Sequence, residues 1–456
     1  MKTISCCLLS ALLAGCVSPP TEISNLSVPT SWQNVGDFPT GSASQDLGNW
    51  WSSFGDAELT RLIRRTYDKN PDIRSGAAAV RQAQAQREAT ASTLLPSLGY
   101  SGSAASGKIW NRDASDSAIR AYSADLTASW EIDFFGKNRQ AVAAADSGIA
   151  AAQADLNATR ASLAAETALA YFQLRAAEAG LAIVRESIVS QEETTQLASW
   201  REQAGEADGL EFEQSKAALE SARAAIDTLE QTVAQSRNRL NLLAGETPGT
   251  LKVSAANALP QPRRSLAIGI PAETIRQRPD VRAAGFRWLA AIANTRSAEA
   301  EQFPSIGLSG SLGIDSLSSS KLFDPETVAA SVIAGLTGPI FDGGRIRANI
   351  QVQDAVEEQN YEAYRKSILT ALSEVEDALI ACQRTESRIA TLEKSVSAAR
   401  SAADLAARKY EAGVIDITQV LDTQRSQLST ERDLLTARLD HSSAYVELYR
   451  ALGGGR

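Results

Sequence analysis

The chain has 456 residues, of which 44% are hydrophobic and 22% charged, and its formal net charge at pH 7 is -9. This length allows two or three ordinary domains, and the apolar fraction is enough for a folded core. The acidic balance argues against a nucleic-acid-binding protein, because neutralising phosphates requires clustered Lys and Arg.

The N-terminus predicts an exported lipoprotein. Residues 1–15 combine a lysine, a short apolar run and small residues, which is typical of a signal peptide and too short for a membrane span. The letters LAGC, ending at Cys16, resemble the lipobox of bacterial lipoproteins. We therefore expect lipid, palmitate included, on Cys16 at the start of an N-terminal segment over 16–55. The alternative is an incidental signal-peptide cysteine.

The rest of the chain reads as two copies of one unit at a constant offset of +208 in residue number. NPDIR at 70–74 returns as RPDVR at 278–282, and LPSLGYSGS at 95–103 returns as FPSIGLSGS at 303–311. A duplication that keeps its register makes each half one structural unit. The predicted boundaries are 56–247 for the first repeat, 248–266 for a linker and 267–453 for the second repeat.

Each repeat is predicted to contain a β-hairpin, because apolar and small polar residues alternate after a proline. The expected strands are about 96–106, 120–135, 304–315 and 328–341. Trp130, Phe134 and Phe135 lie near one strand end, as in an aromatic girdle. Strands of this length can cross a bilayer when tilted, although the edge of a soluble sandwich is the alternative. Lipid cannot satisfy an open sheet edge, so membrane strands would have to be shared among chains.

A very long helix is predicted after each hairpin, over about 138–204 and 346–412. Each would extend about 100 Å at 1.5 Å per residue. Return helices are expected over 208–244 and 416–451. In the second long helix, apolar residues are spaced 4, 3, 4, 3 from Ile368 to Cys382, as in a coiled-coil seam, so Cys382 is predicted to pack in a core.

Glycines mark both ends of these helices. Gly136, Gly343 and Gly344 are predicted to form the strand-to-helix junctions, since FDGGR lacks the pattern of a phosphate loop. Gly205 and Gly413 are expected at the hairpin tips, where a positive φ is needed.

Nothing in the chain indicates an enzyme. His441 is the one histidine, which excludes the usual His-based triads and multi-histidine metal sites. Carboxylates occur along helix faces where charge is expected for solvation. We therefore expect no catalytic residue, no metal and no cofactor beyond the lipid. Trp50 and Trp51 are predicted to dock an N-terminal segment rather than to bind carbohydrate.

Together, the lipobox, duplication, hairpins and long helices resemble the TolC-like outer membrane factors, in particular the OprM-like and NodT-like lipoproteins. The resemblance covers nearly the whole mature chain. Its motifs are NWWSSFGDAELTRLI at 49–63, NPDIRSGAAAVRQAQAQREATASTLLPSL at 70–98, IPAETIRQRPDVRAAGFRWLAAIANTRSAEAEQFPSIGLSGSLG at 270–313, GPIFDGGRIRANI at 338–350 and KYEAGVIDITQVLDTQRS at 409–426. Each motif alone is weak, but their order and spacing are specific.

The resemblance implies a mainly α fold with a β-barrel portion. Three copies would share a twelve-stranded barrel in the bacterial outer membrane, above a helical coiled-coil tube in the periplasm. It also implies a passive exit duct of an RND-type tripartite efflux pump, joined to a periplasmic adaptor and an inner-membrane transporter. A type I secretion duct is an alternative. A lipid-anchored coiled-coil spacer is less favoured, because it would not explain the strands of membrane-spanning length. A free-standing porin is also less favoured, because a simple pore needs no helices of this length.

The resemblance also identifies candidate gate residues. In the family, the second tip carries Tyr-x-x-Gly followed by an acidic residue that narrows the tube. Tyr410 and Gly413 match the first part and Asp422 matches the carboxylate, which predicts a ring of three carboxylates favouring cations. An ordinary solvated carboxylate is the alternative. Gln419 lies where some relatives have a second acidic residue, and Ile415 replaces a basic residue.

Adaptor docking is expected at the two exposed turns, 205–208 and 413–416. These turns run from Gly205 to Asp208 and from Gly413 to Asp416. The alternative for both is a plain helix turn.

Overall fold

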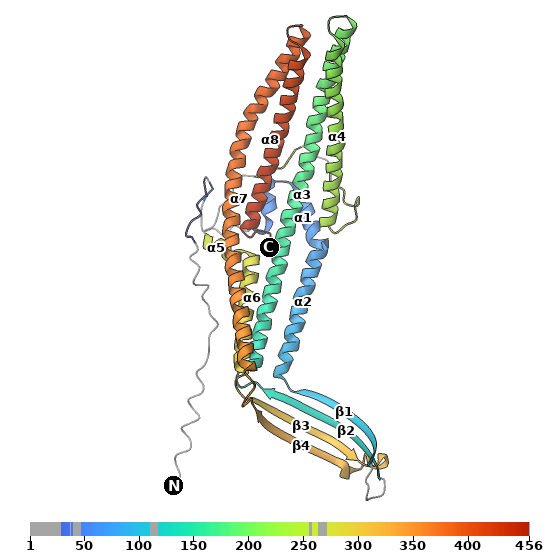
Figure 1. The fold of residues 1–456 in the computed structure, drawn as a ribbon, viewed down its shortest axis with the longest axis vertical. Helices are drawn as coiled ribbons and strands as arrows, with labels where there is room; N and C mark the ends of the chain where they lie inside the picture. Colours follow the sequence, from blue (N-terminus) through green and yellow to red (C-terminus); the bar gives the residue numbers. More distant parts are fainter. Residues whose placement is uncertain are drawn as a thin grey trace.

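The computed structural model describes residues 29–36, 38–39, 47–109, 117–254, 258–262 and 271–455. Figure 1 shows a β-sheet at one end of an elongated molecule and two helical hairpins that reach the other end. The helices are η1 (Leu47–Phe54), α1 (Ala57–Lys69), α2 (Pro71–Ala91), η2 (Ser92–Leu94), α3 (Lys137–Gln203), α4 (Gly209–Leu243), α5 (Pro271–Gln277), α6 (Pro279–Ala300), η3 (Ser319–Lys321), η4 (Pro325–Thr327), α7 (Arg345–Glu411) and α8 (Ile417–Ala451). The strands are β1 (Ser97–Ile109), β2 (Ser117–Ile132), β3 (Ser305–Ser316) and β4 (Val328–Thr337). The predicted signal peptide and Cys16 lie outside the described residues.

The predicted fold class is confirmed: the chain is mainly helical with one four-stranded sheet. The strand order is β1-β2-β3-β4, and all neighbouring strands are antiparallel. Ser97 lies opposite Ser129 in the first hairpin, and Ser305 lies opposite Thr337 in the second. The offset between the repeats maps the first pair onto the second, so the two hairpins have the same register.

Two strands end earlier than the sequence predicts. The fourth strand ends at Thr337 rather than near 341, because Gly338 and Pro339 follow and proline has no N–H for a sheet ladder. The second strand ends at Ile132 rather than 135, because the chain turns at Asp133 to begin a helix.

The long helices α3 and α7 have 67 residues each, which corresponds to about 100 Å. Both begin after a glycine in the left-handed region, Gly136 and Gly344, each with φ 86°. Two carboxylates accept backbone N–H groups of the first helical turns: Asp133 Oδ2 that of Arg139 and Asp342 Oδ2 that of Ile346, both at 2.8 Å. These bonds satisfy donors that a helix start leaves free and join each strand firmly to its helix.

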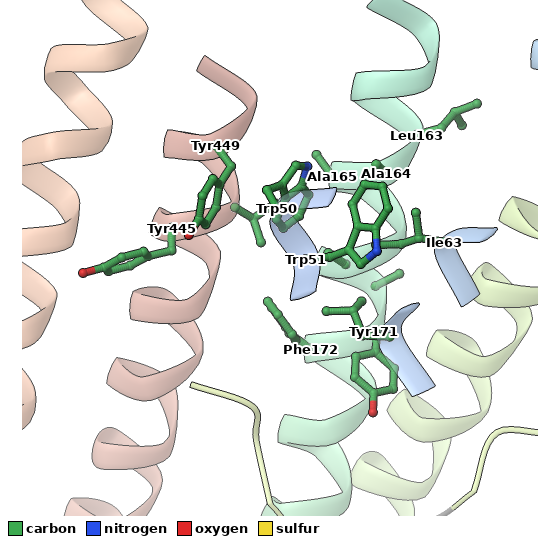
Figure 2. Packing of buried hydrophobic residues seen from close by; sticks show 14 of the residues in the cluster. Trp50, Trp51, Ile63, Leu163, Ala164, Ala165, Tyr171, Phe172, Tyr445 and Tyr449 are labelled. Carbon is green, nitrogen blue, oxygen red and sulfur yellow. The ribbon is translucent and has the colours of Figure 1, made fainter. Parts of the chain in front are cut away.

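The main core lies midway along the molecule, where η1 packs between α3 and α8 (Figure 2). Trp50 stacks on Tyr449 with ring centroids 5.2 Å apart, and Phe54 contacts Phe172 at 5.0 Å. Trp50 and Trp51 are both buried. Each such aromatic side chain stabilises the fold by roughly 2 kcal/mol or more through its apolar burial, so η1 joins the two repeats.

The N-terminal segment also docks on the second repeat. The carboxylate of Glu376 on α7 accepts the backbone N–H of Gln33 at 2.7 Å and that of Asn34 at 3.1 Å. The Asn34 Nδ2 atom donates to the same carboxylate at 2.7 Å, and Trp32 beside it is buried. This clamp fixes the segment on α7 about 50 Å from the sheet, as judged from the helical rise.

Equivalent hydrogen bonds in the two repeats join the start of α2 or α6 to the end of the returning helix. Asn70 Nδ2 donates to the Leu243 carbonyl at 2.9 Å, and Arg278 Nη1 donates to the Ala451 carbonyl at 3.0 Å. Asn70 and Leu243 correspond to Arg278 and Ala451 when 208 is added to their residue numbers, so the two hydrogen bonds are equivalent. The duplication therefore includes these contacts between helices. Among the residues that the structure describes, none of the helices has the length and apolarity needed to cross a membrane.

Candidate functional site at the helical tips

The far ends of the two hairpins have the same backbone geometry. Gly205 and Gly413 have φ 76° and 71°, and each follows the end of a 67-residue helix. Their N–H groups donate to carbonyls three residues earlier, and the next residue donates to a carbonyl five residues back. This pattern is a Schellman motif, which requires a left-handed residue and therefore favours glycine. Asp208 and Asp416 then cap the returning helices α4 and α8.

The carboxylate of Asp416 is held by local donors. Its Oδ1 atom accepts the Thr418 hydroxyl and the Gln419 backbone N–H, the latter at 3.3 Å. These bonds, the hydroxyl first, lower the pKa of Asp416 below its ordinary value. The carboxylate is therefore charged at neutral pH, where it suits the positive end of the α8 dipole.

Tyr410 links the two hairpins. Its side chain is only 1% exposed, and its hydroxyl donates to Glu211 Oε2 on α4 at 3.0 Å. The Arg201 guanidinium of α3 lies over the ring, with Cζ 4.7 Å from the centroid. An aromatic residue of the second repeat is therefore held by an acid and a base of the first repeat. We call Tyr410, Glu211 and Arg201 the tip latch.

Burial and the Glu211 carboxylate raise the pKa of Tyr410 to about 12. The hydroxyl therefore remains protonated and able to donate at neutral pH. Beneath it, Ala406, Ile417, Val420 and Leu421 form a buried apolar cluster with the ring. The latch is consequently seated on a small core of its own, far from the main core.

Asp422 lies near the tip of α8, with its side chain 72% exposed. It forms an ion pair with Arg425 one turn away, at 3.0 Å. Gln419 is also exposed, on the first turn of the same helix. Within one chain the structure thus separates the predicted gate residues: Tyr410 is buried between hairpins, whereas Asp422 and Gln419 face outward.

The predicted junction glycines lie at the other end of the long helices. Gly343 has φ 66°, and Gly136 and Gly344 are the residues directly before α3 and α7. A hollow near this junction is lined by charged and apolar side chains, and within it Phe135 stacks on Phe303 with ring centroids 4.8 Å apart. The three glycines allow the sharp change of direction from sheet to helix that Figure 1 shows.

Sequence reasoning missed several residues that the structure places in this network. Glu211 and Arg201 are the partners of Tyr410, about 200 positions away, and no local pattern indicates that pairing. The capping role of Asp133 and Asp342 could have been predicted from the sequence, since an acidic residue shortly before a helix is a frequent cap. Cys382 is buried as predicted, and burial raises the pKa of its thiol to about 12, which leaves it unreactive.

Comparison with known proteins identifies what this arrangement resembles. The family model described as outer membrane efflux protein matches residues 62–246 and 270–454. The chain is 32% identical to the pyoverdine export outer membrane protein OpmQ of Pseudomonas putida, over 98% of this chain and 96% of OpmQ. It is also 32% identical to the toluene efflux pump outer membrane protein TtgF of Pseudomonas putida, over 89% of this chain and 85% of TtgF. The solved structure of the outer-membrane channel OprN matches with a TM-score of 0.90 at 30% identity, covering 96% of this chain and 99% of that one.

Proposed function

The chain belongs to the outer membrane efflux protein family, and we propose that it is the exit duct of an RND-type tripartite efflux pump. Members of the family are outer membrane efflux channels, and this chain shares their fold over nearly its whole length. The observation that carries the proposal is that one chain combines a sheet whose strands are long enough to span a bilayer with helices of about 100 Å. A simple pore needs no such helices, whereas a conduit across the periplasm does.

Three copies share the barrel in this proposal. The sheet has open edges at β1 and β4 within the described residues, and a bilayer offers no partners for edge N–H and C=O groups. Large apolar side chains such as Leu98, Tyr100 and Val332 are exposed along it, as expected for a lipid-facing surface. A lipid on Cys16 adds a second attachment to the outer membrane.

The partners proposed are a periplasmic adaptor and an energised inner-membrane transporter. The chain itself conducts passively, and its tips at 205–208 and 413–416 are the docking turns for the adaptor. Apolar side chains near the tips support this role, since Trp200 is 60% and Val414 69% exposed. An adaptor that binds the open tip better than the closed one shifts the population toward the open state.

The gate combines two features. The tip latch holds the two hairpins of one chain together, and three copies of Asp422 form an acidic ring at the narrow end. Arg425 pairs with Asp422, so the ring carries less net charge than three isolated carboxylates. Such a ring favours cations, and its field is weakened by salt because the groups are exposed.

Relatives of this chain are named for different cargoes. OpmQ is named for pyoverdine and TtgF for toluene, yet both are equally identical to this chain. Two such different chemistries in relatives of equal similarity are consistent with cargo selection by the transporter rather than by the duct.

The native mass and conductance of the detergent-extracted protein test the proposal. A mass of three chains with channel activity in planar bilayers supports the shared duct. The matched control replaces residues 1–16 by a signal peptide that lacks the lipobox, which removes the lipid but leaves the strands. If that control is a monomer extractable without detergent, the sheet is not in the membrane, and the coiled-coil spacer is the better description.

A further inference from the structure

A layer of polar side chains is buried between the two helical hairpins, beyond the main core in the direction of the tips. Figure 1 shows the hairpins running together over this length, with α8 next to α3. Gln424 on α8 is only 6% exposed, and its Nε2 atom donates to Thr194 Oγ1 at 2.9 Å and to Ser190 Oγ at 3.2 Å, both on α3. We call Ser190, Gln191, Thr194 and Gln424 the polar layer.

Apolar clusters lie on both sides of the polar layer. Toward the tip, Leu421 belongs to the cluster beneath the tip latch, and Leu197 of α3 packs against it. Toward the main core, Leu428 packs against a cluster that contains Ile188 of α3. The spacing from Leu421 through Gln424 to Leu428 is 3 and 4 residues, as along a coiled-coil seam. Gln424 therefore interrupts an otherwise apolar contact between the hairpins.

Two amide oxygens of the polar layer have no hydrogen-bond partner in the part of the chain that the structure describes. They are Gln424 Oε1 and Gln191 Oε1. Gln191 is 7% exposed, and its Nε2 atom donates to Ser187 Oγ of the same helix at 3.0 Å. Because most buried polar atoms in proteins are hydrogen-bonded, each of these oxygens either loses its hydration or immobilises a water molecule. Both alternatives destabilise the closed seam.

Separation of the hairpins removes this penalty. Both amide oxygens would then accept hydrogen bonds from bulk water, and the two bonds that Gln424 donates across the seam would be exchanged for bonds to water at little net loss. The apolar clusters and the tip latch act in the opposite sense, since their contacts are lost when the hairpins part. The polar layer and its neighbours therefore act against one another in the same seam.

We propose that the polar layer biases the tip toward opening, because it makes the seam between α3 and α8 easy to hydrate. The inference rests on the proposed function, since it presupposes a duct whose gate opens when the second hairpin leaves the first. It goes beyond that function by giving Gln424 and Gln191 a role opposite in sign to that of the tip latch. The latch stabilises the closed state, whereas the polar layer lowers the free energy needed to leave it.

Methionine substitution in the full-length, detergent-extracted protein tests the sign of this effect. Gln424→Met keeps a similar length and volume but removes the unpaired oxygen, so the seam becomes apolar at this position. The readout is the open-to-closed ratio in single-channel recordings. We expect the ratio to fall at least about fivefold, which corresponds to the low end of the usual penalty for one unpaired buried acceptor. A side chain that mainly ties the hairpins together would instead raise the ratio when it is replaced.

A second variant and a control make the test specific. Gln191→Met removes the other unpaired oxygen, and since the one bond that this amide donates stays within α3, no tie between hairpins is lost. Its ratio should also fall, and this variant covers a failure of Gln424→Met to fold. The matched control is Gln427→Met on α8, because Gln427 Nε2 donates to Glu431 of the same helix at 3.1 Å. The control should leave the ratio within about twofold of the parent.

The recordings are made both in the parent and with Tyr410→Phe, because loss of the latch increases the number of openings. A lower ratio with Gln424→Met or Gln191→Met in either background, together with an unchanged control, supports the inference. An unchanged or raised ratio in a conducting channel, or an equal fall with Gln427→Met, overturns the inference and leaves the duct standing. A parent that has the native mass of one chain and does not conduct overturns both.

Discussion

Replacing Tyr410 by phenylalanine should loosen the tip while leaving its core intact. The ring is buried and packs under Arg201, so Tyr410→Phe keeps the apolar contacts and removes only the hydroxyl that donates to Glu211 at 3.0 Å. A hydrogen bond to a charged group contributes about 1.5–3 kcal/mol, and partial solvent access to Glu211 reduces this to about 1 kcal/mol. In the proposed gate, each latch then favours the closed tip about fivefold.

In the proposed trimer, three latches act together and amplify the effect. If all three open at once, about 3 kcal/mol is lost, which shifts the closed-to-open ratio on the order of a hundredfold. The assay is single-channel conductance at fixed salt, with open probability as the readout. Tyr364→Phe is the matched control, because Tyr364 is buried in the same helix far from the tip.

A double-mutant cycle makes this prediction specific. Glu211→Gln should loosen the tip similarly, and the double variant should be little more open than either single one, because both remove one interaction. The pH dependence follows from the raised pKa of Tyr410: the contribution is complete below the ordinary value of 10.0 and is lost as pH rises through about 12. Strictly additive effects of the two substitutions would refute the latch.

Three further predictions concern other parts of the chain. Arg278→Ala should lower the free energy of unfolding by about 3 kcal/mol, because it removes the guanidinium that binds Asp280, Glu374 and the Ala451 carbonyl, whereas Asn70→Ala removes one donor to a buried carbonyl and should cost about 1 kcal/mol; equal urea midpoints would contradict this difference. Glu376→Gln should weaken the N-terminal clamp, and faster hydrogen exchange of the two backbone N–H groups that it binds is the readout, with unchanged exchange as the adverse result. Asp422→Ala should raise resting conductance and lower cation preference, whereas Arg425→Ala should raise cation preference; the ring is untenable if the current and selectivity of both variants match the parent.

The elements themselves could be predicted from the sequence because their signals are local or repeated. Period-two alternation located the four strands, and the long runs without proline located α3 and α7 to within one residue at each end. The constant offset between the two copies then predicted that both halves would fold alike. Strand ends were less predictable: apolar residues continue to Ile340, but the backbone at Pro339 cannot extend the ladder.

The contacts between distant segments could not be predicted in this way. Tyr410 meets Glu211 only because the tips of the two helical hairpins lie side by side, about 40 Å beyond the main core. The Glu376 clamp joins segments that are 343 residues apart in the sequence. Such pairings depend on how whole helices pack, and neither propensity nor periodicity indicates which acidic side chain will accept from which donor.

The latch also shows how the two tips of a duplicated chain differ in their side chains although their backbones are alike. The two tips share a Schellman turn and an aspartate cap, so the backbone repeats faithfully. The side chains do not: Glu202 stands at the position corresponding to Tyr410, and Gln419 at the position corresponding to Glu211. A second, equivalent latch between Glu202 and Gln419 therefore cannot form. Each chain has one latch, in which the tyrosine comes from the second hairpin and the glutamate from the first. In the proposed trimer, six similar hairpins would therefore carry three latches rather than six, and the hairpin carrying Tyr410 could separate from the one carrying Glu211 without breaking the turns of either.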